Sequence, residues 1–363
     1  MSVKAFIRDV VMGVPNVLDG ASSSHHDGFE QAAQELGLVI TRLPGRRLRL
    51  IKDGYRPIGS MNQQLTSLTS WSAAAICHNK QETLVRLARA GVPTPLSSAF
   101  NAIHGYDRAL AHFRSMAADG HRLVIKPVNG RGGGGITVGL TTEKKFPQAW
   151  TAALNNMNGR RGAAVLIEQY LPGLDLRAIV VNGRFVCAAT RIPAYVIGDG
   201  RSPVRELIAV KNASRSQKNY YRNYPIVADD STNSEEVPAR GEVFVVNPRC
   251  NVHQGGEAVD LTDEVSGQIK TVAERAALAI PGLGVAGVDL VVDPDLNNGK
   301  VIEVNAHCNF RIHYYPYFGQ SRNPAHTILA EMRALQDSPL RIVGNLTGQW
   351  IVFRVVRKVS SLM

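Results

Sequence analysis

The sequence predicts an α/β protein organised around a β-hairpin that carries acidic side chains. Val288–Val292 and Lys300–Val304 are rich in Val and Ile, as strands are, and a run of turn formers at 293–299 separates them. Helical patterns flank such strands, among them 28–36 (GFEQAAQEL) and the amphipathic stretch Val265–Ile280, which we expect to pack under the hairpin. A chain of 363 residues, 44% hydrophobic and 20% charged, can hold two or three globular domains.

The acids of this hairpin predict a cation site. Side chains alternate faces along a strand, so Glu303 and Asn305 point the same way. If Val292 pairs near Lys300, Asp289 falls opposite Glu303, and two facing carboxylates destabilise a sheet unless they are neutralised. Asp, Glu and Asn oxygens suit Mg²⁺, or Mn²⁺, rather than zinc. On these residues alone, a solvated hairpin face with chance acids is the alternative.

Composition narrows the class of protein. The chain has no apolar run near the ~20 residues that span a bilayer and no signal-peptide pattern at its start, so we expect no membrane association. Its cysteines lack metal or disulfide spacing, which fits a cytoplasmic protein: Cys77, Cys187, Cys250 and Cys308. The net charge of +11, with a basic cluster at 42–56, favours anionic ligands or a solvated edge. Nucleic-acid binding is the alternative, but the basic cluster lacks the interleaved aromatic residues that would support it.

The first 78 residues predict a small α/β unit. The helix at 28–36 precedes a strand at Leu38–Leu43. Before the helix, His25 and His26 lie in a polar, turn-like segment, where they could contact a substrate or remain solvated.

A second helix is predicted from a capping box. Asn79 and Glu82 have the spacing of that motif, the helix continues through Ala90, and Gly91 ends it. Lys80 then lies in the first turn, next to the positive end of the helix dipole, where an anion is the favourable partner.

A glycine-rich turn predicts phosphate contacts. Lys126 lies on a strand at 122–127, and the glycines of 130–135 follow. Glycine lets backbone N–H groups approach phosphate oxygens without interference from a Cβ atom. The pattern is neither a P-loop nor a dinucleotide-binding turn, and a flexible hairpin loop is the alternative.

Two arginines are predicted to lie close together on a hairpin. Strands at Leu176–Val181 and Arg184–Thr190 flank the turn Asn182-Gly183. Pairing about this turn offsets Arg177 and Arg191 by one or two residues, so an anion is expected between them.

In this order, these pieces resemble the ATP-grasp ligase superfamily, and within it the cyanophycin synthetase and glutathione synthetase type. The resemblance extends from about Asn79 to Ala325 and is densest in three phrases, Asp175–Gly200, Asn251–Asp263 and Ile302–Pro316. It implies an ATP-grasp fold with an N-terminal α/β pre-ATP-grasp domain at 1–78, a small lobe at 79–166 and a large lobe at 167–363.

The resemblance also implies roles for individual residues. Lys80 and Lys126 would bind the α- and β-phosphates of ATP, and the loop with Gly130, Gly132, Gly133 and Gly134 would close over the β- and γ-phosphates. The hinge residues Glu168, Gln169, Tyr170 and Leu171 would meet adenine, and Asp175 the ribose. Arg177 and Arg191 would be catalytic, stabilising the transferred phosphoryl group and the oxyanion, while Asp289, Glu303 and Asn305 would hold two Mg²⁺ ions. Substrate carboxylate binding is placed on Arg311 and His313, with Asn251, Gly255 and Gly256.

The activity implied is an amide-bond ligase. ATP would phosphorylate a carboxylate, and the amine of a small amino acid or peptide would attack the acyl phosphate, with release of ADP and phosphate. In the family, the asparagine that binds metal is followed by a small residue and then Pro-Gly, whereas this chain has AHCN at 306–309. We therefore expect the wall of the substrate site to differ from that of the family. We expect a stand-alone cytoplasmic ligase, as a homodimer, that does not make a polymer. The alternatives are a basic nucleic-acid- or ribosome-associated protein, and a ligase that modifies a protein terminus.

Overall fold

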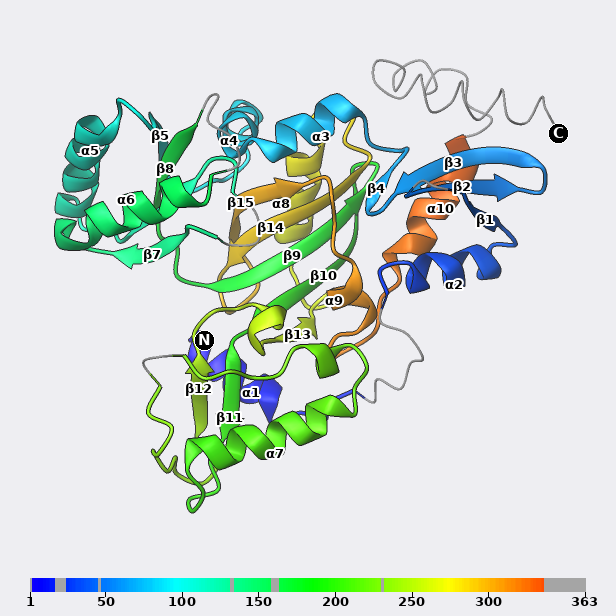
Figure 1. Ribbon diagram of the computed structural model, residues 1–363. Coiled ribbons are helices and arrows are strands. Elements are labelled where there is room, and N and C mark those ends of the chain that lie inside the picture. The colour runs from blue at the N-terminus through cyan, green and yellow to red at the C-terminus, as the bar shows by residue number, and fades with distance from the viewer. Residues whose placement is uncertain are drawn as a thin grey trace.

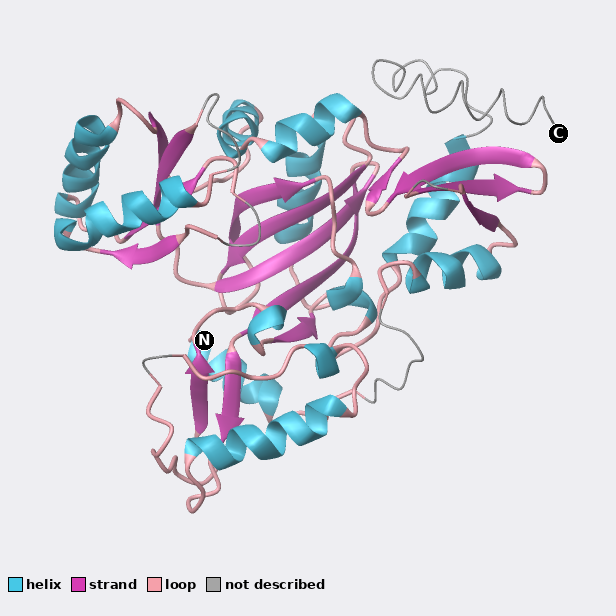
Figure 2. Cartoon of the chain, viewed as in Figure 1, coloured by secondary structure: helices cyan, strands magenta, loops and turns pink. Residues whose placement is uncertain are grey.

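The computed structural model describes residues 2–16, 24–44, 47–130, 134–157, 163–229 and 232–335. Helices and strands are both abundant (Figure 2), and the named strands form four sheets in which every pair is antiparallel. Within the described part of the chain, no helix combines the length and apolar character needed to cross a membrane.

A five-stranded sheet lies at the centre of the molecule (Figure 1). Its order is β13 (Glu257–Asp260), β10 (Arg184–Ile192), β9 (Leu174–Val181), β14 (Val285–Val292) and β15 (Gly299–Asn305). One face is apolar, with Leu176, Ala178 and Val288 fully buried in the same core cluster as α8 (Gly267–Leu278). The predicted helix under the hairpin is therefore confirmed. On the opposite face, Ile179, Val181 and Val285 belong to a second core cluster, and the polar side chains occupy the rest of that face.

The predicted β9–β10 hairpin is confirmed. Asn182 and Gly183 have φ angles of 48° and 75°, as a two-residue hairpin turn of the I′ kind requires. A bulge between Phe185 and Cys187 then shifts the register, and Arg191 pairs with Asp175.

The pairing predicted at the acidic residues of the β14–β15 hairpin is confirmed. Val292 pairs with Gly299, next to Lys300, and Lys300 pairs with Val291. A bulge between Leu290 and Asp289 shifts the register by one residue, so Asp289 does lie opposite Glu303. Pairing arithmetic cannot foresee a bulge, because the unpaired residue leaves no local signal.

A second sheet lies at one side of the central sheet, in the order β5 (Ser97–Asn101), β8 (Ala164–Gln169), β6 (Leu123–Pro127) and β7 (Thr137–Leu140). The helices α5 (Tyr106–Ala118) and α6 (Phe146–Asn155) cover it with a separate aromatic core (Figure 1). Between the two sheets lies α4 (Lys80–Arg89), after α3 (Trp71–His78). As predicted, the side chain of Asn79 caps α4 by accepting from Glu82 N at 3.1 Å, and Gly91 follows the helix with a φ of +62°.

The N-terminal sheet has the order β1 (Val39–Arg42), β2 (Leu48–Asp53), β3 (Arg56–Asn62) and β4 (Leu65–Thr66). Two helices from opposite ends of the chain, α2 (Asp27–Glu35) and α10 (Pro324–Leu335), pack together beside it. The predicted helix and strand in this region are confirmed as α2 and β1. By contrast, α1 (Val3–Val11) lies away from β1–β4 (Figure 1), and its buried residues belong to the core cluster of the central sheet rather than to that of the small sheet of β11 (Ala194–Ile197) and β12 (Val243–Asn247).

A buried ion cluster joins α7 (Val204–Ser216) to the edge strand β13. Arg215 on α7 is 1% exposed, and its Nη1 donates to Oε1 of the fully buried Glu257 at 2.7 Å. Lys211 Nζ lies 3.0 Å from the same oxygen. Arg215 Nη2 also donates to Tyr224 O at 2.8 Å, so the cluster fixes the segment that follows α7.

We expect Glu257→Gln to lower the free energy of unfolding by about 3–5 kcal/mol, because it strands two cations next to a neutral amide. Urea denaturation followed by circular dichroism measures this change. The matched control is Arg205→Met on the same helix, whose ion pair with Glu235 is exposed and should contribute little. Equal midpoints for Glu257→Gln and the unaltered chain would contradict the role assigned to the cluster.

Candidate active site

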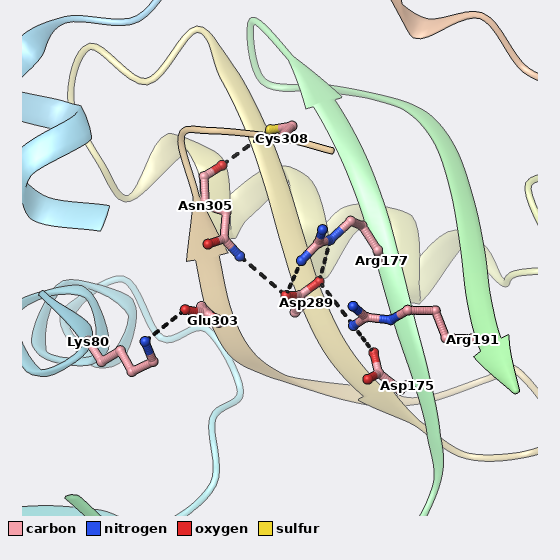
Figure 3. Close-up of polar contacts among 8 residues, drawn as sticks. All are labelled: Lys80, Asp175, Arg177, Arg191, Asp289, Glu303, Asn305 and Cys308. Carbon is pink, nitrogen blue, oxygen red and sulfur yellow. Dashed lines mark hydrogen bonds and ion pairs between the residues drawn. The ribbon is translucent and has the colours of Figure 1, made fainter. Parts of the chain in front are cut away.

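Guanidiniums and carboxylates alternate on the polar face of the central sheet (Figure 3). Arg177 on β9 is the cross-strand partner of Asp289 on β14, and it donates from Nε and Nη2 to the two carboxylate oxygens at 2.7 and 2.6 Å. Arg191 on β10 donates to Asp175 Oδ1 at 2.5 Å and lies 3.8 Å from Asp289 Oδ1. Arg177 faces Ala189, two residues from Arg191, so the predicted offset is confirmed. The anions expected between these arginines are therefore the carboxylates of Asp289 and Asp175, which belong to the sheet itself.

The protonation of Asp289 follows from these contacts. Asp289 is 4% exposed, and burial alone would raise its pKa. The guanidinium of Arg177, followed by that of Arg191, outweighs burial and lowers the pKa below its usual value. Asp289 is thus an ionised acceptor at neutral pH.

The three residues predicted to hold metal come together on this face. Glu303 on β15 lies opposite Asp289, and Asn305 Nδ2 donates to Asp289 Oδ2 at 3.2 Å. Lys80 Nζ lies 3.0 Å from Glu303 Oε1 and donates to Gly130 O at 3.1 Å. The repulsion between the two acids is therefore relieved here by Arg177 and Lys80 (Figure 3). Two carboxylates and an amide oxygen on one face still match the donors that Mg²⁺ prefers.

The second predicted lysine lies in a buried ion pair. Lys126 Nζ on β6 donates to Glu168 Oε1 on β8 at 2.9 Å, and both residues are buried. Glu168 Oε2 is buried without a hydrogen-bond partner among the described residues. At Gly130, a Cβ atom would come within 2.5 Å of Pro127 Cγ, so the turn requires glycine there. Gly134 is described, whereas Gly132 and Gly133 lie outside the described residues.

The predicted hinge follows the end of β8. Gln169 N donates to Leu96 O and Tyr170 N to Arg122 O, both at 2.8 Å, and the Arg122 guanidinium lies 4.5 Å from the centre of the Tyr170 ring. Leu171 comes directly after these contacts, in the connection to β9. These backbone contacts extend the pairing of β8 with its two neighbours in the outer sheet, and the contact of the hinge with adenine stays a prediction.

Three of the predicted substrate residues have structural roles. The side chain of Asn251 caps a short turn by accepting from His253 N at 3.0 Å. Gly255 has a φ of +92°, and a Cβ atom there would come within 2.6 Å of Ile226 Cα. A Cβ atom on Gly256 would come within 2.7 Å of Ile192 O. Backbone geometry thus explains the Gly-Gly pair without a substrate.

His313, on the short helix α9 (Arg311–Tyr314), is buried beside the arginines. Its Nδ1 lies 3.5 Å from Cys187 Sγ, and its Nε2 has no hydrogen-bond partner in the described chain. Burial, followed by the charges of Arg177 and Arg191, lowers its pKa to about 3. A neutral imidazole therefore faces the Arg177–Asp289 pair. Cys308, expected to be part of a wall, is buried and donates to Asn305 O at 3.3 Å.

Sequence reasoning missed an aromatic group next to Arg311. The Arg311 guanidinium carbon lies 5.3 Å from the centre of the Tyr220 ring and 5.9 Å from that of Tyr224. The only local signal was the tyrosine-rich stretch 218–224 (KNYYRNY) between charged and polar residues. His25, for which the sequence allows either substrate contact or solvation, is half-buried, and burial, followed by the charge of Arg311, lowers its pKa to about 4.

The buried His313 predicts a pH-dependent stability. An unfolded histidine gains its proton below about pH 6.5, whereas the folded chain keeps His313 neutral down to about pH 3. Between these values the unfolded state binds more protons, so stability falls as the pH falls, by up to about 1.4 kcal/mol per pH unit from this group. We expect His313→Asn to flatten the dependence of the free energy of unfolding on pH in acid. The exposed His104→Asn controls for loss of an imidazole, and an unchanged slope in His313→Asn would contradict the assignment.

The chain is similar to known proteins over most of its length. Residues 103–218 match the family model of the prokaryotic glutathione synthetase ATP-grasp domain. A cyanophycin synthetase from a Nostoc species is 30% identical over 348 residues, which cover 91% of this chain and 37% of that protein. A glutathione biosynthesis bifunctional protein from Mannheimia succiniciproducens is 30% identical over 282 residues, 72% of this chain and 36% of that protein.

Among solved structures, a bifunctional glutathione synthetase from Pasteurella multocida superposes with a TM-score of 0.61 at 24% identity, covering 85% of this chain and 43% of that one. This likeness confirms the predicted ATP-grasp fold. The chain spans little more than a third of the length of either curated relative. The chain therefore has the ATP-grasp fold, matches an ATP-grasp domain model over residues 103–218, and is similar in sequence to cyanophycin synthetases and to bifunctional glutathione biosynthesis proteins.

Proposed function

We propose that this chain is an ATP- and Mg²⁺-dependent ligase that forms an amide bond between a carboxylate and the amine of a small amino acid or peptide. One observation carries the proposal. Lys80, itself buried, contacts both the carbonyl of Gly130 in the glycine loop and Glu303 of the acidic hairpin. Lys80 thus connects a glycine-rich loop, of the kind that binds phosphate, to side-chain oxygens of the kind that bind Mg²⁺, which fits a site for a metal–nucleotide complex.

The reaction needs charge neutralisation and positioning rather than a protein nucleophile. ATP supplies the phosphoryl group: a carboxylate oxygen of the substrate attacks the γ-phosphorus, the bond to the bridging oxygen breaks, and ADP leaves. The amine then attacks the carbonyl carbon of the acyl phosphate, the carbon–oxygen bond to phosphate breaks, and the nitrogen loses a proton. Arg177 and Arg191 would stabilise the negative charge that develops in both steps.

The remaining assignments belong to the same proposal. Lys126 would join Lys80 on the α- and β-phosphates, the 168–171 hinge would meet adenine, and Asp175 would bind the ribose. Asp289, Glu303 and the amide oxygen of Asn305 would hold Mg²⁺ once the phosphates draw Arg177 and Lys80 away from them. The cytoplasmic location and the homodimer stay predictions.

The proposal predicts ADP and phosphate, without AMP or pyrophosphate, when pairs of amino acids or short peptides are supplied with ATP and Mg²⁺. A coupled ADP-release assay over a matrix of such pairs, with chromatography of the nucleotides, measures this. Glu303→Gln should lower the rate at least about a hundredfold, because it removes one negative charge from the side chains proposed to bind Mg²⁺. The control is Glu82→Gln, a partly exposed acid of α4 that pairs with Arg86. Release of AMP would contradict the acyl-phosphate route.

The contact between Lys80 and Glu303 predicts that metal binds poorly without nucleotide. We expect Lys80→Met to raise the affinity for Mn²⁺ in the absence of nucleotide by about tenfold, because Glu303 loses the cation that competes for it. Titration of free Mn²⁺ by electron paramagnetic resonance measures this without turnover. Lys144→Met removes an exposed lysine and should leave the affinity unchanged. The same weak Mn²⁺ binding in Lys80→Met as in the unaltered chain would contradict the metal assignment of Glu303.

A further inference from the structure

Two arginines lie directly opposite each other in the N-terminal sheet. Arg42 on β1 is the cross-strand partner of Arg49 on β2, so both side chains leave the same face of the sheet, with Cβ atoms about 5 Å apart. Like charges in this arrangement destabilise a sheet unless an opposite charge neutralises them. In the central sheet, the like-charged pair of Asp289 and Glu303 has neighbouring cations that do so.

Arg42 and Arg49 have no such counter-ion in the part of the chain that the structure describes. None of the ion pairs there includes either residue. The first turn of α2 does not supply one. Asp27 Oδ2 accepts from Tyr315 Oη at 3.0 Å, and no ion pair among the described residues involves the exposed Glu30. The two guanidiniums therefore favour an anion brought from outside.

Both guanidiniums lie on the face of the sheet that packs against α2. Side chains two positions apart on a strand share a face. Arg42 thus shares the face of Ile40, and the same spacing places Arg49 on the face of Ile51. Ile51 belongs to one core cluster with the buried residues of α2, and Ile40 packs against that cluster. The arginines extend this face beyond its apolar part.

The arginine pair lies toward the N-terminal end of α2. Leu38 N donates to Ala33 O at 2.7 Å, which closes the turn between α2 and β1 and sends β1 back along the helix. Arg42, the last residue of β1, therefore lies toward the first turn of α2. Burial, followed by the charge of Arg49, lowers the pKa of His26, which precedes α2, and this agrees with the placement.

The first turn of α2 also contacts α9 (Figure 1). The hydrogen bond from Tyr315 to Asp27 joins the residue after α9 to the first residue of α2. A Cβ atom on Gly28 would come within 2.2 Å of Tyr314 Cζ, so glycine allows this close approach. α9 also carries His313, whose ring contacts β10 of the central sheet. The arginine pair therefore lies on the side of the N-terminal sheet that leads to the candidate active site.

The hairpin that carries the pair favours an acidic peptide over nucleic acid as the ligand. Residues 36–52 contain five cations, no acid and no aromatic side chain on which a base could stack. Arg47, exposed in the connection between the strands, extends the positive charge beyond the pair. Guanidiniums bind carboxylates through two parallel hydrogen bonds, and several guanidiniums side by side match a series of carboxylate side chains.

We propose that Arg42, Arg47 and Arg49 bind acidic side chains of an extended peptide substrate, while the reacting end of that peptide lies at the central sheet. This inference rests on the proposed ligase function and gives the substrate class: a peptide with Asp or Glu residues several positions from the group that is joined. The arginines act on binding alone, because they lie outside the set of residues that would meet ATP, the metal or the reacting carboxylate.

Fluorescence anisotropy of the full chain with a labelled hexaglutamate peptide tests the site without turnover. We expect this peptide to bind, and its hexaglutamine counterpart to bind at least about tenfold more weakly. The double substitution of Arg42→Gln with Arg49→Gln should weaken hexaglutamate binding by about tenfold or more. Arg42→Gln alone, at an exposed position, should show part of that loss and remains informative if the double variant fails to fold.

The matched control is Lys144→Gln with Lys145→Gln, at two exposed lysines of η1 (Glu143–Lys145). It removes the same net charge and should bind hexaglutamate as the unaltered chain does. A single-stranded oligonucleotide of the same charge is the second probe. Absence of hexaglutamate binding, an equal loss in the two double variants, or tighter binding of the oligonucleotide than of hexaglutamate would overturn the proposal.

Steady-state kinetics separates this proposal from the function on which it rests. For any peptide substrate that releases ADP, a form extended by glutamates should have a higher KM in the Arg42→Gln, Arg49→Gln variant, with kcat and the KM of ATP unchanged. A form extended by glutamines should show no difference between the variant and the unaltered chain. If no substrate releases ADP, the ligase function fails while anisotropy still decides the peptide site. Equal KM values for the glutamate form, with ADP released, would overturn the peptide site alone.

Discussion

The two-point contact between Arg177 and Asp289 constrains the rest of the site. A buried carboxylate costs several kcal/mol unless a cation with suitable geometry meets it, and here both oxygens of Asp289 accept from one guanidinium at 2.7 and 2.6 Å. The contact exists only if β9 and β14 are neighbours in this register. It thereby fixes which face of the sheet is polar. Asp175 lies on that face because it is two positions from Arg177 on β9, and Arg191 on β10 lies there because it is the cross-strand partner of Asp175.

The same face keeps its charges nearly balanced. Arg177 and Arg191 are matched by Asp289 and Asp175, and Lys80 by Glu303. The proposed ligase would have to accept a highly charged nucleotide and its metal without a large reorganisation of its own dipoles. Ion pairs within the sheet would meet that demand, because the phosphates would offer each cation another anion and the metal would offer each carboxylate another cation. Arg311 is not part of this balance, since no carboxylate in the described part of the chain forms an ion pair with it.

The side of the site next to Arg311 depends on the buried cluster around Glu257. Arg215 connects α7, β13 and the carbonyl of Tyr224, and Tyr221 Oη donates to Tyr315 O at 3.1 Å. These contacts hold the tyrosine-rich segment against α9. Position 311 therefore meets rings from about ninety residues earlier in the chain. Chains of buried polar contacts of this kind order a segment that short-range propensity would leave as a loop.

The amino-acid sequence by itself determined the hairpins, the capped helix with Lys80 and the amphipathic helix under the sheet, because turn chemistry and side-chain alternation act over a few residues. The sequence also predicted that Asp289 lies opposite Glu303, although it gave no sign of the bulge at Asp289–Leu290 that accompanies this pairing. Only the tertiary structure decided the partners: Arg177 with Asp289, which lie 112 positions apart, Lys80 with Glu303, and Arg311 with Tyr220. The physical reason is that such contacts depend on strand order and on how the sheets pack, and neither is encoded within any short stretch of chain.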